Sequence, residues 1–510
     1  MQARAEQTWK AEGWPLVLFW SGLVLLIVLL GFVVLPTLNL GFVGDDFTLL
    51  VPDKPLPLTQ SEDELHRPLR NAILRIVESQ LGIQQVLPYR LIVAGSFVAA
   101  LMLIFRLTRR LGANRLGALT ADFVLAFFPR NQEVLFWFAA WQDLVAAIAV
   151  LLACLSFLDF REFGRRFSLG VAALAYVIAL GFKETTVVLP VLLVSIDFYR
   201  QRSISSFSQR SFWRAYIPFA CILLAYVIYF FADSGLASLA GRRTGGYYGF
   251  RGFGRLFAAV VRTLINIALP FSITVGLKDI HWWHLVVLLC ELGAGLLLIW
   301  RFHLWAAAIL TASWLVCTIL PTATFANSFG MLDRYLFVPM LGVAVFAGLL
   351  VGALVVSPKG ARYFIPACIA LALYTSLGIS QLMLSREVWR RTGKQSAMVI
   401  QETMRLCSML PAGSEVDIIN VTFGNGLREA LRANGLSGSL RILRNSSTSD
   451  SQQQRLVAEL LRCAGPAVNT ARKQTFLMEE GGRILRLDSE CASSLVDSDR
   501  ARRPGAWDSL

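Results

Sequence analysis

Charged residues are scarce in this 510-residue sequence: Asp, Glu, Lys and Arg make up 16% of it, against 55% hydrophobic residues. An average soluble domain contains about 25% charged residues, so this composition excludes a mainly soluble chain and predicts a polytopic membrane protein. Histidine is also rare, with four residues, and the eight cysteines are scattered singly. No Cys-x-x-Cys motif and no internal repeat is present, so the sequence has neither a zinc or redox motif nor a repeat architecture.

The net charge of +14 does not indicate a nucleic-acid partner. Outside the C-terminal region, most arginines and lysines lie in short segments between apolar runs, as they do in the cytoplasmic loops of membrane proteins. Examples are residues 106–115, 161–166 and 199–214. We interpret the positive charge as a topology signal that places these loops in the cytoplasm.

The apolar runs predict about eleven transmembrane helices with a cytoplasmic N-terminus, since roughly 20 apolar residues cross the ~30 Å hydrocarbon core. The predicted spans are 14–36, 86–105, 116–128, 137–158, 169–182, 187–198, 217–231, 285–300, 304–320, 335–356 and 363–384. A further run, 256–277, contains Arg262 and Pro270, and we predict a re-entrant or surface-lying segment there. If this run crosses the membrane, every later span inverts.

Two adjacent carboxylates, Asp45 and Asp46, follow the first predicted span. Ionisable groups at the membrane boundary are candidate functional groups, although a solvated turn also explains an acidic pair. The alternation of basic loops places this pair, Glu133 and the Lys183-Glu184 pair on the non-cytoplasmic face. Arg70 to Glu78 has apolar residues at helical spacing, which predicts an amphipathic helix on the membrane surface or a small soluble helix.

The C-terminal region is soluble in composition. Residues 416–421 and 440–443 are predicted strands, 426–433 a helix, and 475–487 a hairpin around Glu480-Gly481-Gly482. We therefore predict three parts: a membrane domain over 1–385, a small extracytoplasmic α/β domain over 386–492, and a disordered tail over 493–510.

Several motifs in the membrane domain resemble those of GT-C-type membrane glycosyltransferases, in particular the protein O-mannosyltransferase branch and its TPR-containing transmembrane relatives. The matching pieces are Gly44-Asp45-Asp46-Phe47, His66-Arg67-Pro68-Leu69, Phe128 to Val134 with Trp141-Gln142-Asp143, Gly181 to Thr185 ahead of an apolar run ending in Asp197, and Asp333 to Pro339. Together they cover roughly residues 14–385. The chain departs from these relatives in having no TPR repeats and no large insertion in the later loop, which favours a bacterial member.

The resemblance implies an inverting glycosyltransferase that moves a sugar from a polyprenyl-phosphate donor to a hydroxyl acceptor. Asp45 is then the catalytic base, with Asp46 orienting it or raising its pKa by like-charge proximity. Arg67, Lys183 and Arg334 are the candidates for binding the donor phosphate, since arginine forks and lysine point charges suit phosphate oxygens. Supporting residues are Glu133, Glu184 and Tyr335.

Each of these residues also has a simpler explanation. Lys183 and Glu184 could form a local ion pair at a helix end, and Arg334 with Tyr335 could anchor an interface. Glu133 is expected either to pair with Arg130 or to support Asp45. His281 and His284 lack a nearby carboxylate cluster and are more typical of an aromatic belt than of a metal site; no metal is assigned, and a divalent cation at Asp45 and Asp46 stays open.

A transporter or lipid-linked sugar flippase is the alternative function, because it too would place charged residues beside spans. It should line a midplane pathway with broken helices, often in two related halves, whereas here the charged motifs gather on one face. An inactive or scaffolding relative is a third class. The expected location is the bacterial inner membrane with the active site facing the periplasm or exterior, and the expected partners are the lipid bilayer, the donor and a protein or glycan acceptor.

Overall fold

The computed structural model describes residues 13–43, 46, 50, 67–82, 85–201, 213–239, 253–268, 281–325, 333–357 and 360–408, and four short strands beyond them. The chain forms two compact units. The first contains Met1–Leu38, Leu56–Ile73 and Leu87–Arg386, and the second contains Asn39–Pro55, Leu74–Val86 and Glu387–Leu510. The predicted tail over 493–510 lies outside the described residues, and the predicted domain limits stay predictions.

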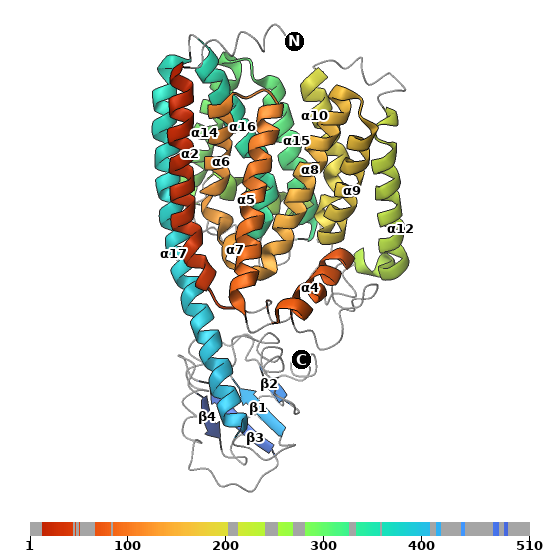
Figure 1. The fold of residues 1–510 in the computed structure, drawn as a ribbon, viewed down its shortest axis with the longest axis vertical. Helices are drawn as coiled ribbons and strands as arrows, with labels where there is room; N and C mark the ends of the chain where they lie inside the picture. The colour runs from red at the N-terminus through yellow and green to blue at the C-terminus, as the bar shows by residue number, and fades with distance from the viewer. Residues whose placement is uncertain are drawn as a thin grey trace. The chain divides into compact units, whose positions relative to one another are not determined.

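The described part of the first unit is helical (Figure 1). The α-helices among the described residues are α2 (Gly13–Val34), α4 (Pro68–Leu81), α5 (Val86–Arg110), α6 (Arg115–Ala126), α7 (Gln132–Phe136), α8 (Trp141–Phe163), α9 (Arg166–Phe182), α10 (Leu189–Gln201), α12 (Ile217–Leu239), α13 (Phe253–Ala268), α14 (Trp282–Arg301), α15 (Trp305–Phe325), α16 (Phe337–Val356) and α17 (Ala361–Ser408). The 3-10 helices are η1 (Leu35–Asn39), η2 (Pro129–Asn131), η3 (Phe138–Ala140), η4 (Glu184–Val188) and η7 (Asp333–Leu336).

Seven helical stretches in the described residues are long and apolar enough to cross a bilayer, which makes the chain an integral membrane protein. They are Leu16–Asn39, Val86–Arg110, Phe138–Phe163, Trp282–Arg301, Trp305–Ala323, Asp333–Val356 and Arg362–Met398. The other four of the eleven predicted spans coincide with α6, α9, α10 and α12. The 12 residues of α6 extend only ~18 Å at 1.5 Å per residue, well short of the hydrocarbon core. Eleven crossings therefore stay a prediction.

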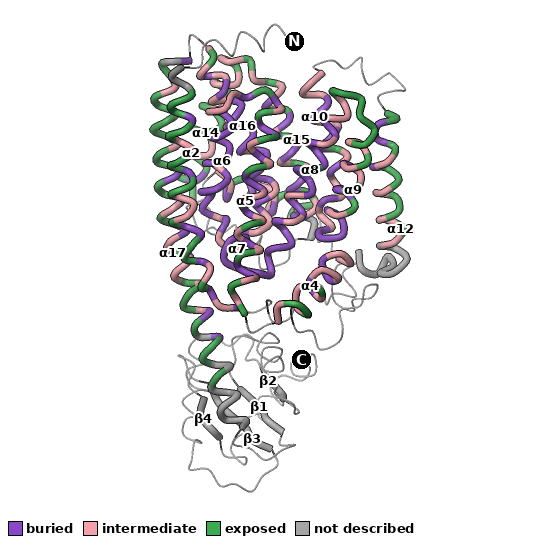
Figure 2. Tube along the Cα trace, in the orientation of Figure 1, coloured by how far each residue is buried: buried purple, intermediate pink, exposed green. Residues whose placement is uncertain are grey.

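The core of the first unit lies along α6, α8 and α16 (Figure 2). In the span containing α8, 67% of the most apolar window is buried, whereas only 6% of that window is buried in α14. Small residues allow this packing: a Cβ placed on Gly348 of α16 would lie 2.6 Å from the carbonyl oxygen of Gly117 in α6. The two backbones therefore touch directly, as membrane helices do where small residues meet.

The amphipathic α4 forms as a helix over the stretch where its periodicity predicted one. Helix α13 covers the first part of the run 256–277, which was predicted to be re-entrant or surface-lying. Its Thr263 and Asn266 are buried, whereas Phe253 and Phe257 are exposed, so α13 has one face turned inward and one apolar face turned out. Because residues 269–277 lie outside the described residues, the question of whether 256–277 crosses stays a prediction.

The second unit contains a four-stranded sheet in the order β2-β1-β3-β4. The strands are β1 (Glu415–Ile419), β2 (Leu440–Leu443), β3 (Lys473–Met478) and β4 (Ile484–Leu487). β1 is parallel to both β2 and β3, while β3 and β4 pair in antiparallel fashion. These strands overlap the predicted strands and hairpin. The helix predicted over 426–433 lies outside the described residues, so the α/β character of this domain stays a prediction.

Candidate functional site

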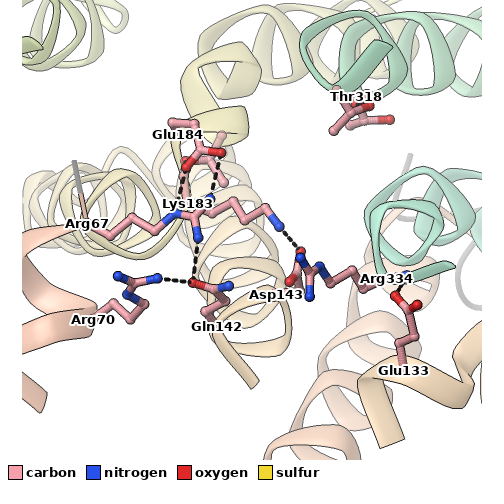
Figure 3. Close-up of polar contacts among 11 residues, drawn as sticks. Arg67, Arg70, Glu133, Gln142, Asp143, Lys183, Glu184, Thr318 and Arg334 are labelled. Carbon is pink, nitrogen blue, oxygen red and sulfur yellow. Dashed lines mark hydrogen bonds and ion pairs between the residues drawn. The ribbon is translucent and has the colours of Figure 1, made fainter. Parts of the chain in front are cut away.

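A cluster of charged side chains in the first unit is built from helix ends (Figure 3). Arg67 directly precedes α4, Lys183 lies between α9 and η4, and Arg334 belongs to η7, just before α16. The first turn of α8 contributes Gln142 and Asp143. Helix ends leave backbone groups unsatisfied and let the chain change direction, so long polar side chains from separate helices can converge there.

Arg67 and Glu184 form a bidentate ion pair. The Nε and Nη2 atoms of Arg67 donate to the two carboxylate oxygens of Glu184 at 2.8 and 2.9 Å, and its Nη1 donates to Oε1 of Gln142 at 2.9 Å. Arg70 donates to the same amide oxygen at 3.2 Å. Burial alone would raise the pKa of Glu184, but the charge and hydrogen bonds of Arg67 outweigh it and lower this pKa to about 2. Glu184 is therefore a fixed anion that orders Arg67.

Lys183 donates a hydrogen bond through Nζ to Oδ1 of Asp143, and both side chains are almost completely buried. The ammonium nitrogen also lies 4.3 Å from the centre of the Tyr335 ring, within the range of a cation–π contact. Burial, helped by the positive charge of Arg67, lowers the pKa of Lys183 to about 8 despite the attraction of Asp143. The local Lys183-Glu184 pair is not formed, because Lys183 pairs with Asp143 and Glu184 pairs with Arg67.

The Arg334 guanidinium lies on aromatic rings rather than on a carboxylate. Its Cζ is 4.6 Å from the centre of the Trp137 ring and 5.4 Å from that of Tyr335. Within the described residues, its Nε has no hydrogen-bond partner, and Oδ2 of Asp143 has none either. A buried donor and a buried acceptor without partners mark a place where a polar ligand would restore the lost hydrogen bonds.

These unpartnered atoms belong to residues that border a pocket. Its polar lining consists of Asp143, Lys183, Thr185, Thr186, Thr318, Thr322, Arg334 and Tyr335, and apolar residues of η4, α8, α10 and α16 complete it. The hydroxyls of Thr318 and Thr322 each donate to a carbonyl one turn earlier, which leaves their oxygen lone pairs as acceptors. The pocket therefore combines two cations, the Asp143 carboxylate, hydroxyls and an apolar wall.

Glu133 supports the segment that carries Arg334. Its Oε2 accepts a hydrogen bond from the backbone N–H of Arg334 at 3.0 Å. Burial raises the pKa of Glu133 to about 7, although the charge of Arg334 opposes this shift. The expected pairing of Glu133 with Arg130 is not seen, because Arg130 instead donates to Asp333 at 3.0 Å.

Asp45, the predicted catalytic base, lies outside the described residues. Asp46 is completely buried, and its Oδ2 accepts from the backbone N–H of Val43 at 3.0 Å, while its own N–H donates to the Val43 carbonyl at 3.1 Å. These bonds join the residues on either side of Gly44 and Asp45. No group of three His, Cys, Asp or Glu residues in the described ranges could hold a metal ion. His281 donates its backbone N–H to Nδ1 of His284, so this pair caps α14.

The structure brings together Arg67, Lys183, Glu184, Arg334, Tyr335 and Glu133, all of which were candidates from the sequence. Asp143 and Gln142 were part of the Trp141-Gln142-Asp143 motif but had no assigned role, and Asp333 with Arg130 was not assigned either. For Asp143, the sequence did contain a signal: this carboxylate lies in the first turn of an apolar helix, where a buried charge requires a partner.

Comparisons with known proteins identify the fold. No protein-family model and no curated protein sequence matches the chain. The chain is similar to the crystal structure of ArnT from Cupriavidus metallidurans in the apo state, with a TM-score of 0.53 and 12% identity over 95% of this chain and 99% of that one. It is also similar to the archaeal oligosaccharyltransferase AglB from Archaeoglobus fulgidus, with a TM-score of 0.50 and 11% identity over 83% of this chain and 64% of that one.

These similarities show that the membrane helices adopt the GT-C type of fold, as the motifs predicted. At this level of identity they show the fold alone. The relation to the O-mannosyltransferase branch stays a prediction.

Proposed function

We propose that this protein is an inverting GT-C-type glycosyltransferase, which moves a sugar from a polyprenyl-phosphate donor to a hydroxyl acceptor on the extracytoplasmic side of the membrane. The observation that carries the proposal is the half-buried Arg334, which lines the same pocket as Lys183 and has a buried Nε atom unpartnered among the described residues. In a GT-C fold, such a site suits an anionic leaving group.

The chemistry requires positive charge where the phosphate leaves. Arg334 has no ion pair among the described side chains, and its aromatic supports hold the guanidinium plane without neutralising it. Lys183 adds a second positive charge, although Asp143 binds it in the absence of substrate. Preorganised donors of this kind stabilise developing charge without having to reorganise during the reaction. Arg67, whose donors already bind Glu184 and Gln142, contributes charge and orders the surrounding segment.

The catalytic base in this proposal is Asp45. It takes the proton of the acceptor hydroxyl as the acceptor oxygen bonds to the anomeric carbon, while the bond from that carbon to the phosphate oxygen breaks and polyprenyl phosphate leaves. Attack from the face opposite the phosphate inverts the anomeric centre. The hydrogen bonds between Val43 and Asp46 support a role for Asp46 in orienting its neighbour. The free acceptor capacity of Thr318 and Thr322 suits sugar hydroxyls.

The test is transfer of radiolabelled sugar from a pool of polyprenyl-phosphate sugars, measured in membranes with matched levels of each variant. We expect transfer by the wild type and none by Asp45→Asn. Arg334→Ala should lower kcat/KM by about 10²–10³, the range for loss of one preorganised donor. Arg165→Ala removes an exposed arginine at the end of α9 opposite Lys183 and should transfer normally.

Two results would contradict the proposal. Equal transfer by wild type and Asp45→Asn, above an empty-vector control, excludes Asp45 as the base. Absence of transfer by folded wild-type protein with every sugar tried excludes the glycosyltransferase function.

A further inference from the structure

The turn that carries Arg334 is held by one segment of the chain, residues 130–133. Its backbone N–H donates to Glu133 of α7, and the neighbouring Asp333 accepts from Arg130 at 3.0 Å and from Gln132. Arg130 in turn donates through Nη2 to Oδ1 of Asn266 in α13 at 3.1 Å. The Arg130–Asp333 pair is mostly buried, with 12% and 11% of the two side chains exposed. Four consecutive residues, 130–133, thus supply three contacts to η7.

We propose that Arg130, through Asp333, and Glu133 are positioning residues that hold η7, so that the guanidinium of Arg334 stays directed at the phosphate of the donor. The inference rests on the function proposed above and adds residues to it that do not themselves touch the substrate. Among the described residues, the Arg334 side chain has ring contacts and no carboxylate partner to fix its direction. Its direction must therefore come from its own backbone and from the rings beneath it.

Glu133 acts as a helix cap supplied from another segment. η7 runs directly into α16, so the first N–H groups of this helical stretch have no acceptor within it. The carboxylate of Glu133 satisfies one of these N–H groups, and a negative charge is also favourable near a helix N-terminus. Loss of this acceptor frees the first turn, which is the turn that includes Arg334.

The charge state of Glu133 makes its hydrogen bond to η7 depend on pH. Arg334 and Asp333 of η7 and Asp143 of α8 act on the carboxyl electrostatically, and Arg130 of η2 binds Asp333. Because the pKa of Glu133 is about 7, the carboxylate is mostly ionised at pH 8 and mostly protonated at pH 6. Protonation weakens the acceptor, so Arg334 is held best on the alkaline side.

The test measures binding of tritiated farnesyl monophosphate, a short polyprenyl phosphate, to the purified full-length protein in detergent micelles. We expect Arg334→Ala to weaken binding about a hundredfold, which leaves a measurable affinity, and Glu133→Ala to weaken it about tenfold, as the loss of a cap would. Glu133→Gln keeps a neutral acceptor oxygen but loses the negative charge, so at pH 8 it should bind about three- to fivefold more weakly than wild type and more tightly than Glu133→Ala. Thermal unfolding of each variant checks that it is folded.

Two comparisons separate positioning from a general structural role. In an Arg334→Ala background, Glu133→Ala should cause no further loss, since its effect passes through Arg334; an additive loss would overturn the inference. Between pH 8 and pH 6 the wild type should lose more affinity than Glu133→Gln, which shares the titration of the phosphate but not that of the carboxyl. Identical pH profiles would overturn it as well.

The same experiment distinguishes the two proposals. If Arg334→Ala binds the probe as well as wild type, both the proposed function and this inference fail. If Arg334→Ala loses binding while Glu133→Ala binds normally, the positioning role of Glu133 is wrong and the proposed function is unaffected.

Discussion

Arg67 and Glu184 form the best-defined ion pair of the site, with 10% and 12% of their side chains exposed. We predict that Arg67→Met lowers the free energy of unfolding by about 3–5 kcal/mol, because it leaves the Glu184 charge buried without its partner. Thermal unfolding in detergent measures the loss. The matched control is Arg390→Ala, which removes an exposed partner of Glu387 in α17 and should leave stability unchanged. Equal stability of Arg67→Met and wild type would show that the pair contributes nothing.

The pH dependence of this pair has a definite sign. The folded-state pKa of Glu184 is about 2, which lies below its ordinary value near ~4.3. The stabilisation is therefore fully present above pH ~4.3 and is lost as the pH falls towards 2. The difference in stability between wild type and Glu184→Gln should shrink over that interval, and a constant difference would contradict the assignment.

The residues of the site were predictable as candidates, but their partners were not. Asp143 begins an apolar helix beside Trp141, which is also a common position for an interfacial polar residue. Only the packing of α8 against α9 shows that it meets Lys183.

At the scale of elements, Gly181 sets the distance between α9 and α4. A Cβ on this residue would lie 2.6 Å from Cγ of Leu69, which follows Arg67 by two residues. We predict that Gly181→Val displaces the start of α4, destabilises the protein by about 1–3 kcal/mol and lowers transfer. Gly170→Val on the same helix is the control, since no atom lies within 4 Å of a Cβ there. Similar effects of both substitutions would mean that the contact with Leu69 is unimportant.

The helices themselves follow from their apolar composition, whereas their capacity to cross the membrane does not. The α6 and α10 helices have 12 and 13 residues, although both lie in runs that alternate regularly with basic loops. Hydropathy reports which residues avoid water, but a short apolar helix is equally well buried by neighbouring helices.

At the scale of the whole molecule, the basic loops predict which ends of the helices face the cytoplasm. In intact cells, a membrane-impermeant thiol reagent should label Gln80→Cys, and it should label Arg165→Cys and Ser357→Cys only after permeabilisation. Gln80 and Arg165 are exposed in the structure, and unmodified protein gives the background from the native cysteines. Labelling of Arg165→Cys in intact cells would show that the predicted topology is inverted. Labelling of Ser357→Cys but not of Arg165→Cys in intact cells would show that residues 256–277 cross the membrane.

The sequence by itself determined that the chain lies in a membrane and which residues are candidates for the site. Low charge and long apolar runs require a membrane, and the ordered motifs indicated the GT-C fold. The tertiary structure decided which charges meet. Lys183 has extended backbone angles, φ −152° and ψ 120°, so its side chain and that of Glu184 point in different directions. One therefore reaches Asp143 and the other Arg67. Neighbours in sequence become partners only when the backbone lets their side chains face each other, and here the packing of helix ends supplied other partners.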